Sequence, residues 1–168
     1  MNATAHILDG TALAKKLKDE LKKETARLND TFGGVPHLVN VMVGNDAGSC
    51  AYANSQKKVA EYIGIKYELK ILSEDTTQAR LISVIKELDA DSGVHGIMIH
   101  KPVPEQIDYR AVANYVAPSK DLEGINVTNI GKMMLGQTRI IPCTPAAVME
   151  HIRSTGVKLR GKEAVVVG

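Results

Sequence analysis

Two short runs of apolar residues, at positions 38–43 and 97–99, limit what this chain can fold into more than any other feature. Each run is bounded by glycine or proline, which is typical of a strand that is buried on both faces. Strands of that kind occur in parallel sheets that helices cover on both sides. We therefore predict an α/β fold, built as a three-layer αβα unit around a mainly parallel sheet.

The rest of the chain alternates between helical and strand spacing. The expected elements are a helix from 11 to 28, a strand at 38–43, a helix at 49–63, a strand at 66–72, a helix at 76–90, a strand at 97–99 and a short helix at 109–115. After a glycine-interrupted stretch we expect a helix at 146–154 and a strand at 165–167. We expect a first domain over residues 1–118 and an interdomain segment over 119–145. Residues 146–168 would then begin a Rossmann-type second domain.

Composition argues against several classes of function. The 168 residues carry a formal net charge of only +2 with acids and bases interspersed, so we expect no nucleic-acid partner. No apolar run approaches a membrane span and the N-terminus lacks the layout of a signal peptide, so we expect a cytoplasmic protein without a membrane partner. Cys50 and Cys143 predict buried free thiols, and the scattered histidines predict no metal site.

Charged residues follow the second buried run. His100 and Lys101 stand at its carboxyl end, and Lys120, Asp121 and Glu123 come later in the chain. Ligands of open α/β sheets bind beyond the carboxyl ends of the strands, which makes these side chains candidate site residues. On this segment alone, a solvated loop between a strand and a helix explains the same charges equally well.

A second segment favours a binding site. The turn-rich loop 44–49 leads into the helix 49–63, in which Tyr52 and Gln56 share one face near the N-terminus. Four stretches keep a recognisable order and spacing: VGNDAGSCAYANSQKKVAEYIGI, HGIMIHKPVP, PSKDLEGINVTNIGKM and PCTPAAVMEHI. They resemble landmarks of the bifunctional methylenetetrahydrofolate dehydrogenase/methenyltetrahydrofolate cyclohydrolase family, and the resemblance extends from LDGTALAK to the last residue.

The resemblance implies a role in one-carbon folate metabolism. The implied reactions are NAD(P)-dependent oxidation of 5,10-methylenetetrahydrofolate to the methenyl form and hydrolysis of that form to 10-formyltetrahydrofolate. The domain at 1–118 would bind the tetrahydrofolate derivative, with Tyr52 as the ring-stacking tyrosine. The implied catalytic residues are Tyr52, Gln56, His100 and Lys101, and the implied substrate-binding residues are Tyr52, His100, Asp121 and Glu123.

The chain departs from the family pattern within this same set of residues. Gln56 stands where the bifunctional members carry a lysine, and a carboxamide cannot exchange a proton near neutral pH. His100 replaces a glutamine, Lys101 replaces a leucine, and Glu123 replaces an aspartate. Three possibilities stay open: His100 with Lys101 supplies a new base, only the dehydrogenase step remains, or the site merely binds its ligand.

The end of the chain resembles the beginning of the family's cofactor-binding domain. In the family the strand at 165–167 is the first of the dinucleotide-binding domain, and Gly168 would open the loop that holds the cofactor phosphates. The resemblance implies NADP or NAD and a homodimer for a full-length form, and we expect no cofactor to bind these residues alone. Two alternatives remain, a non-enzymatic folate-binding or interaction module derived from this scaffold and a different small-molecule transferase on a similar sheet.

Overall fold

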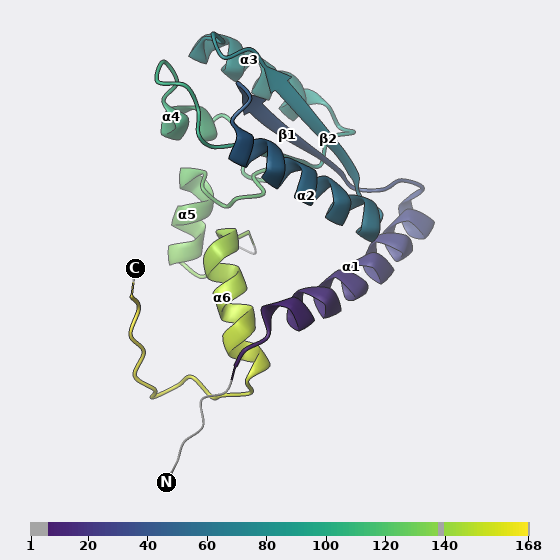
Figure 1. The fold of residues 1–168 in the computed structure, drawn as a ribbon, viewed down its shortest axis with the longest axis vertical. Coiled ribbons are helices and arrows are strands. Elements are labelled where there is room, and N and C mark those ends of the chain that lie inside the picture. Colours follow the sequence, from purple (N-terminus) through teal and green to yellow (C-terminus); the bar gives the residue numbers. More distant parts are fainter. Residues whose placement is uncertain (1–6, 138–139, 168) are drawn as a thin grey trace.

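The computed structural model describes residues 7–137 and 140–167 and contains a three-stranded parallel sheet flanked by helices (Figure 1). The strands are β1 (His37–Val43), β2 (Lys66–Leu72) and β3 (Gly96–Ile99), in the spatial order β2-β1-β3. The helices are α1 (Gly10–Phe32), α2 (Ala47–Ile63), α3 (Gln78–Ala90), α4 (Tyr109–Ala113), α5 (Val127–Met134) and α6 (Cys143–Ser154). The predicted α/β class with a parallel sheet is confirmed.

The central position of β1 places α2 and α3 on opposite faces of the sheet. α2 connects β1 to β2, and α3 returns across β1 to β3. Right-handed crossovers that run in opposite directions cover opposite faces. Val39 and Val41 of β1 pack with Leu81 of α3 in the apolar core. The alternate residues of β1 face α2, which puts Asn40 opposite Gln56.

Local hydrogen bonds fix where α2 begins and ends. The Asp46 carboxylate accepts from the Ser49 backbone N–H at 2.8 Å, and Gly64 ends the helix with a φ of 79°, a left-handed conformation that favours glycine. The Ser49 hydroxyl also donates to the Lys101 carbonyl at 2.7 Å. This bond ties the N-terminal part of α2, which carries Tyr52, to the loop that follows β3.

The loop after α4 passes along the outer edge of β3. The Ile97 N–H donates to the Lys120 carbonyl at 2.8 Å, and Ile97 and Asp121 form a parallel bridge. Gly96 permits the close approach, because a Cβ at that position would lie only 2.5 Å from Leu122 Cδ1. The edge contact therefore holds this loop beside the carboxyl end of β3.

Two elements in the C-terminal third differ from expectation. α5 forms where the glycines suggested irregular structure, and the Asn126 side chain caps it by accepting from the Thr128 N–H at 2.8 Å. The strand expected at 165–167 is not formed, and its three valines are 87%, 96% and 92% exposed. A strand needs a hydrogen-bonded neighbour, and the described residues offer none to this segment.

The remaining C-terminal expectations have mixed outcomes. The helix expected at 146–154 is present as α6, which begins at Cys143. The prediction of two buried thiols is wrong, since Cys143 is exposed and Cys50 half-buried; α6 buries none of its side chains fully. Gly168 lies outside the described residues, so the cofactor loop and the domain boundaries stay predictions. Within the described ranges, every helix is too short or too polar to cross a bilayer.

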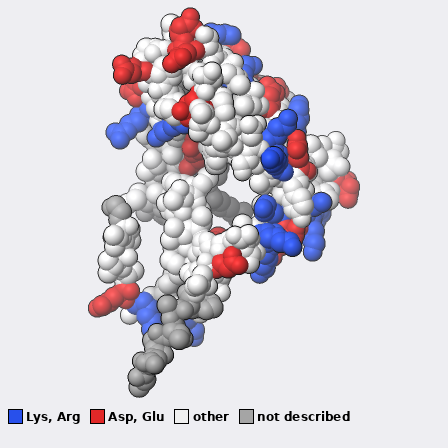
Figure 2. All heavy atoms as spheres, viewed as in Figure 1, with Lys and Arg blue, Asp and Glu red and all other residues white. Residues whose placement is uncertain are grey.

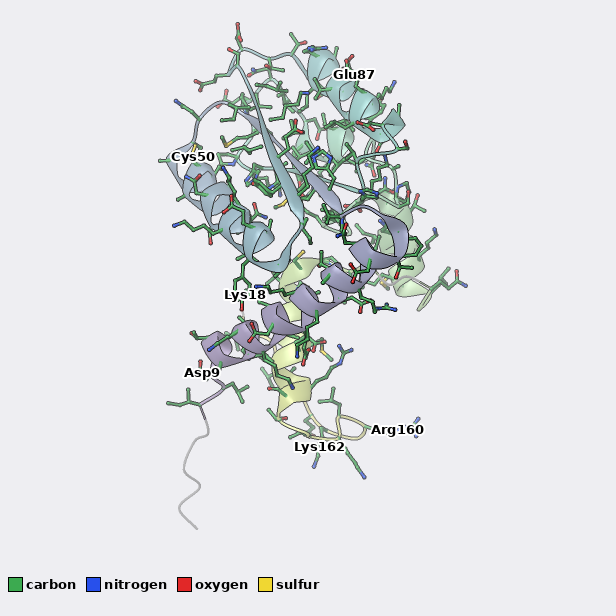
Figure 3. All side chains as sticks on the ribbon, turned by 90° about the vertical axis from the view of Figure 1, so that its right-hand side faces the viewer. Asp9, Lys18, Cys50, Glu87, Arg160 and Lys162 are labelled. Carbon is green, nitrogen blue, oxygen red and sulfur yellow. The ribbon has the colours of Figure 1, made fainter. Side chains whose placement is uncertain are left out.

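The charged side chains are spread over the surface. Figure 2 shows acids and bases interspersed over one face, with basic side chains prominent beside α1. α1 is largely exposed: Figure 3 shows it running below the sheet from Asp9, and Thr25 is its only buried residue. The apolar core therefore depends on the other elements, whereas α1 lines a hollow that it shares with the C-terminal end of α2.

Candidate functional site

A cavity of about 480 Å³ lies beside β3 and around its carboxyl end. Its walls come from α2, from β3 and the loop after it, from the loop at 122–125, and from the start of α6. Among its lining residues are five of the predicted site residues: Tyr52, Gln56, His100, Lys101 and Glu123. The fold thus brings together side chains that are far apart in the sequence.

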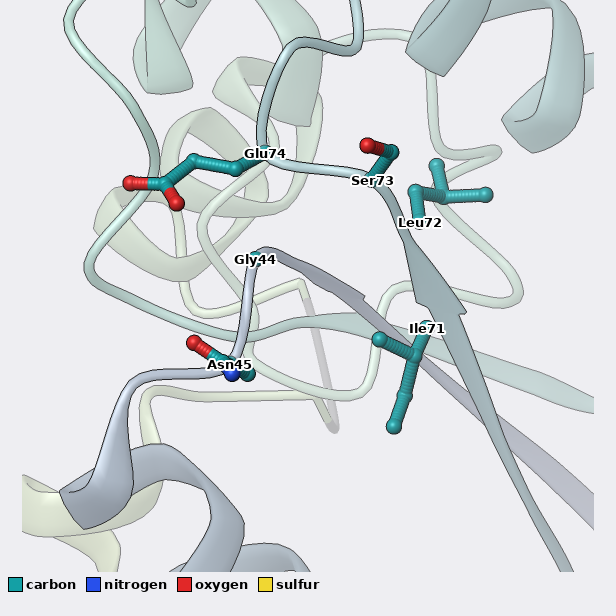
Figure 4. Close-up of a pocket in the computed structure, with 6 residues that line it drawn as sticks. All are labelled: Gly44, Asn45, Ile71, Leu72, Ser73 and Glu74. Atoms are coloured by element: carbon teal, nitrogen blue, oxygen red, sulfur yellow. The ribbon is translucent and has the colours of Figure 1, made fainter.

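A second hollow, of about 290 Å³, lies between the carboxyl ends of β1 and β2 (Figure 4). Gly44, Asn45 and residues 71–74 line it, and Glu74 is the titratable side chain among them. None of the predicted site residues lines this hollow. The cavity beside β3 is therefore the candidate functional site.

Uncharged polar side chains meet beneath that cavity, in a cluster that we call the floor network: Asn40, Gln56, Tyr67 and His100. Asn40 Nδ2 lies 2.8 Å from Gln56 Oε1, 3.0 Å from the Tyr67 hydroxyl and 2.9 Å from His100 Nε2. Asn40 is 0% and His100 2% exposed. Burial lowers the pKa of His100 and raises the pKa of Tyr67, which favours the neutral form of both. The floor network therefore offers hydrogen bonds without charge.

Tyr52 supplies an aromatic surface at the same cavity. Its side chain is 53% exposed, and its ring meets the His100 ring edge to face, with 5.8 Å between the centroids and 70° between the planes. A flat ligand ring that stacks on the exposed part of Tyr52 would gain on the order of 0.5–1.5 kcal/mol beyond burial.

The charged side chains of the cavity surround Tyr109. The Tyr109 hydroxyl donates to Glu123 Oε2 at 3.0 Å, and Lys101 Nζ lies 4.2 Å from the centroid of the Tyr109 ring. Burial raises the pKa of Glu123, although the Tyr109 hydrogen bond and the Lys101 charge oppose the shift. Burial and the neighbouring Glu123 carboxylate hold the pKa of Tyr109 well above its usual value. This part of the cavity can pair with a ligand group that carries N–H donors.

Asp121 differs from the other predicted site residues, because it does not line the cavity. It is buried, and its Oδ1 accepts from the N–H groups of Glu123 and Gly124 at 3.2 and 3.0 Å. Its Oδ2 accepts from the Asn126 N–H and from Asn129 Nδ2, both at 2.9 Å. The carboxylate is thus occupied within its own loop, and it fixes the backbone that carries Glu123.

Replacing Asp121 by asparagine is expected to lower the free energy of unfolding by about 2 kcal/mol, because an NH₂ group would then face N–H donors that need an acceptor. Urea unfolding of the chain measures this change. Asp75→Asn, at an exposed turn position, is the matched control and should leave stability unchanged. Equal stability of both variants would show that the Asp121 carboxylate is not needed to hold the loop.

The lowered pKa of His100 gives a pH dependence of stability with a definite sign. Below the ordinary histidine pKa of about 6.5, the unfolded chain binds a proton at His100 that the folded chain resists binding. The unfolding free energy should therefore be fully retained above that pH and decrease as the pH falls below it. His100→Gln removes this titration while keeping an acceptor for Asn40.

Urea unfolding at several pH values between about 7.5 and 5.5 tests the contribution of His100. The wild-type chain should lose more stability on acidification than His100→Gln does. His151→Gln, on α6 outside the cavity, is the control and should follow the wild type. Parallel pH profiles for the wild type and His100→Gln would contradict the assignment.

Three residues of the site were missed in the sequence: Asn40, Tyr67 and Tyr109. Asn40 is a polar residue inside the apolar run 38–43, and that interruption is a signal that could have been used. Tyr67 lies in an alternating strand whose pairing register the sequence does not reveal. Tyr109 was expected only as the start of a short helix, and its contact with Glu123 depends on the path of the loop after α4.

The fold and the cavity define a small-molecule-binding α/β domain. An exposed tyrosine ring, the half-buried Glu123 carboxylate and a neutral polar floor suit a flat ligand that carries several hydrogen-bonding groups. The chain belongs to the tetrahydrofolate dehydrogenase/cyclohydrolase family, because the family model of the catalytic domain matches residues 8–123.

Relatives of known structure and sequence agree with this assignment. The bifunctional protein FolD of Heliobacterium modesticaldum is 42% identical over 165 residues, which are 98% of this chain and 57% of that protein. The crystal structure of the bifunctional enzyme FolD from Campylobacter jejuni matches with a TM-score of 0.90 and 35% identity, over 94% of this chain and 56% of that one. The FolD enzyme of Trypanosoma brucei, solved with NADP and an inhibitor, matches with a TM-score of 0.87 and 31% identity, over 94% and 54%. The chain spans little more than half the length of these relatives.

The described residues do not form a dinucleotide site. Such a site needs a glycine-containing loop that leads from a strand into a helix N-terminus. Residues 162–167 have no regular structure, and Gly168 lies outside the described ranges. No chemical step is therefore assigned to a nicotinamide on these residues. The described ranges also contain no group of three His, Cys, Asp or Glu side chains placed to hold a metal ion.

Proposed function

We propose that this chain supplies the folate-binding, catalytic part of an enzyme that oxidises 5,10-methylenetetrahydrofolate to the methenyl form. The observation that carries the proposal is the convergence of Tyr52, Gln56, His100, Lys101 and Glu123 on one cavity in a member of this family. A longer form would use NADP or NAD as its hydride acceptor, form a homodimer and act in the cytoplasm.

Each side chain has a role that its environment supports. The Tyr52 ring stacks on the flat part of the folate, and the Glu123 carboxylate accepts hydrogen bonds from the amino-pyrimidine edge. His100 and Gln56 orient the ligand by hydrogen bonds from the floor network. Asp121 acts indirectly, by fixing the loop that carries Glu123.

The same cavity is poorly equipped for hydrolysis of the methenyl form. A general acid or base must exchange a proton near the reacting carbon, and the Gln56 carboxamide cannot do so. Burial lowers the pKa of His100, which makes its imidazole a weaker base, and the Lys101 amine lies over the Tyr109 ring. We therefore propose that the cyclohydrolase step is slow. This absence of a proton-exchanging group at position 56 also favours the second candidate, a folate-binding module without catalytic activity.

Calorimetric titration with a stable 5,10-bridged tetrahydrofolate analogue tests the proposed site. The wild-type chain should bind the analogue, and Tyr52→Ala should weaken binding about tenfold, which corresponds to about 1.4 kcal/mol. Tyr62→Ala is the matched control, since Tyr62 is an exposed tyrosine on the same helix that does not line the cavity. Absence of binding, or equal affinity of Tyr52→Ala and the wild type, would overturn the proposal. Turnover of 5,10-methylenetetrahydrofolate by a form that binds nicotinamide would distinguish the proposed enzyme from a folate-binding module without catalytic activity.

A further inference from the structure

Asn40 occupies an unusual place in the sheet. It lies on the central strand, on the face that packs against α2, and it is fully buried. Its single amide nitrogen contacts side chains from α2, from β2 and from the residue after β3. Its Oδ1 is buried without a hydrogen-bond partner in the described part of the chain. A buried polar group that is left unsatisfied costs stability, so its place beneath the cavity calls for an explanation.

The orientation of the Asn40 amide determines the chemistry of His100. A neutral imidazole carries its proton on one ring nitrogen and accepts a hydrogen bond at the other. Asn40 Nδ2 is a donor and lies 2.9 Å from His100 Nε2, so a hydrogen bond between them requires Nε2 to accept and Nδ1 to carry the proton. If the Asn40 amide were turned around, its Oδ1 would face His100 Nε2, and Nε2 would then have to carry the proton. His100 Nδ1 has no hydrogen-bond partner among the described residues, which leaves it for a ligand in the cavity that His100 lines.

The same amide also orients Gln56. Asn40 Nδ2 donates to Gln56 Oε1 at 2.8 Å, and Gln56 Nε2 lies 3.3 Å from the Met98 sulfur, a weak acceptor. With Oε1 turned toward Asn40, the NH₂ group of Gln56 makes only the weak contact with Met98 among the described residues, so it can donate to a stronger partner. Gln56 and His100 therefore share one feature, a free donor in the wall of the cavity.

We propose that Asn40 is a positioning residue that fixes His100 in the Nδ1–H tautomer and Gln56 with its amide nitrogen free, so that both present donors to the ligand. The ligand group that meets them is then an acceptor, such as a carbonyl oxygen or an unprotonated ring nitrogen. His100 serves as a donor and not as a general base. The identity of the ligand rests on the function proposed above, whereas the tautomer of His100 does not.

Nitrogen-15 NMR of histidine-labelled protein measures the tautomer directly in the ligand-free 168-residue chain. In the wild type we expect His100 Nδ1 to be protonated and Nε2 to be unprotonated near neutral pH. Asn40→Asp replaces the donor by a group that only accepts, and it should transfer the proton to Nε2. Tyr67→Phe is the matched control, because it removes another partner of Asn40 and should leave the His100 tautomer unchanged.

The outcomes separate this inference from the proposed function. A wild-type spectrum with the proton on Nε2 overturns the inference, and this result does not depend on whether any variant folds. An unchanged tautomer in folded Asn40→Asp also overturns it. Asn40→Leu should weaken binding of the bridged tetrahydrofolate analogue about tenfold. If the wild type shows the Nδ1–H tautomer but does not bind the analogue, the proposed function fails while the positioning role of Asn40 stands.

Discussion

Replacing Gln56 by lysine is expected to raise hydrolysis of 5,10-methenyltetrahydrofolate by at least about 10²-fold, within the roughly 10²–10⁴-fold that general acid–base catalysis provides. The side chain at position 56 lines the cavity and reaches Asn40 and Met98, so a lysine amine would enter the same space. Partial burial and the positive charge of the methenyl ligand both lower the pKa of an amine there. A group that can exchange protons would then stand beside the reacting carbon.

Hydrolysis consumes no nicotinamide, so the loss of methenyl absorbance can be followed with this chain alone. Gln56→Met, which has similar size and no exchangeable proton, is the control and should show no gain. If Gln56→Lys binds folate but hydrolyses the methenyl form no faster than the wild type, the absence of a lysine at position 56 is not what limits hydrolysis. A loss of residual hydrolysis in His100→Gln or Lys101→Leu would then show that the base has moved to those residues.

Replacing Glu123 by alanine is expected to weaken binding of the bridged tetrahydrofolate analogue by about 100-fold, which corresponds to about 2.7 kcal/mol. Glu123 is the carboxylate that lines the cavity, and hydrogen bonds to a charged group in a partly buried site are the stronger ones. Calorimetric titration measures the loss. Glu105→Ala, at an exposed position outside the cavity, should bind like the wild type.

The raised pKa of Glu123 adds a pH criterion to this experiment. A glutamate with a raised pKa takes up its proton at a higher pH than an ordinary glutamate, and the protonated form no longer accepts charge-assisted hydrogen bonds. Affinity of the wild type should therefore decrease on mild acidification, before most surface carboxylates are protonated. Glu123→Gln should be weak throughout and should lack this decrease. A wild-type affinity that is constant over the same range would exclude ligand binding by the Glu123 carboxylate.

The helices and strands between 37 and 113 could be predicted from the sequence to within a few residues. Apolar runs bounded by turn residues identified β1 and β3, and helical spacing identified α2 and α3, because in this part of the chain local pattern and burial agree. α5 was missed since Gly131 and the short length of the helix obscure its periodicity, while its Asn126 cap was not recognised. The strand at 165–167 was wrongly expected, because an apolar segment cannot form a strand without a hydrogen-bonded neighbour.

The candidate site was predictable only in part. Motif spacing identified the residues around the cavity, but it could not show which of them are occupied by their own neighbours. Asp121 and Asn40 illustrate the two kinds of failure: a carboxylate that serves its own loop, and a buried amide that reaches the site through other side chains. Both depend on contacts across the sheet edge or between strands, and such contacts are set by the tertiary fold.

The two sides of the sheet differ in how readily another chain could add to them. β3 is covered by the loop at 120–122, whereas β2 has a strand neighbour on one side only within the described residues. The charged side chains of β2 alternate as Lys66, Glu68 and Lys70, of which Lys66 and Glu68 are exposed and Lys70 is half-buried. An antiparallel second copy paired about Glu68 would set Glu68 against Glu68 and Lys66 against Lys70, and like charges directly opposite each other are destabilising. The charges of β2 thus disfavour this antiparallel pairing of two copies at the open edge, and with it edge-to-edge aggregation in this register.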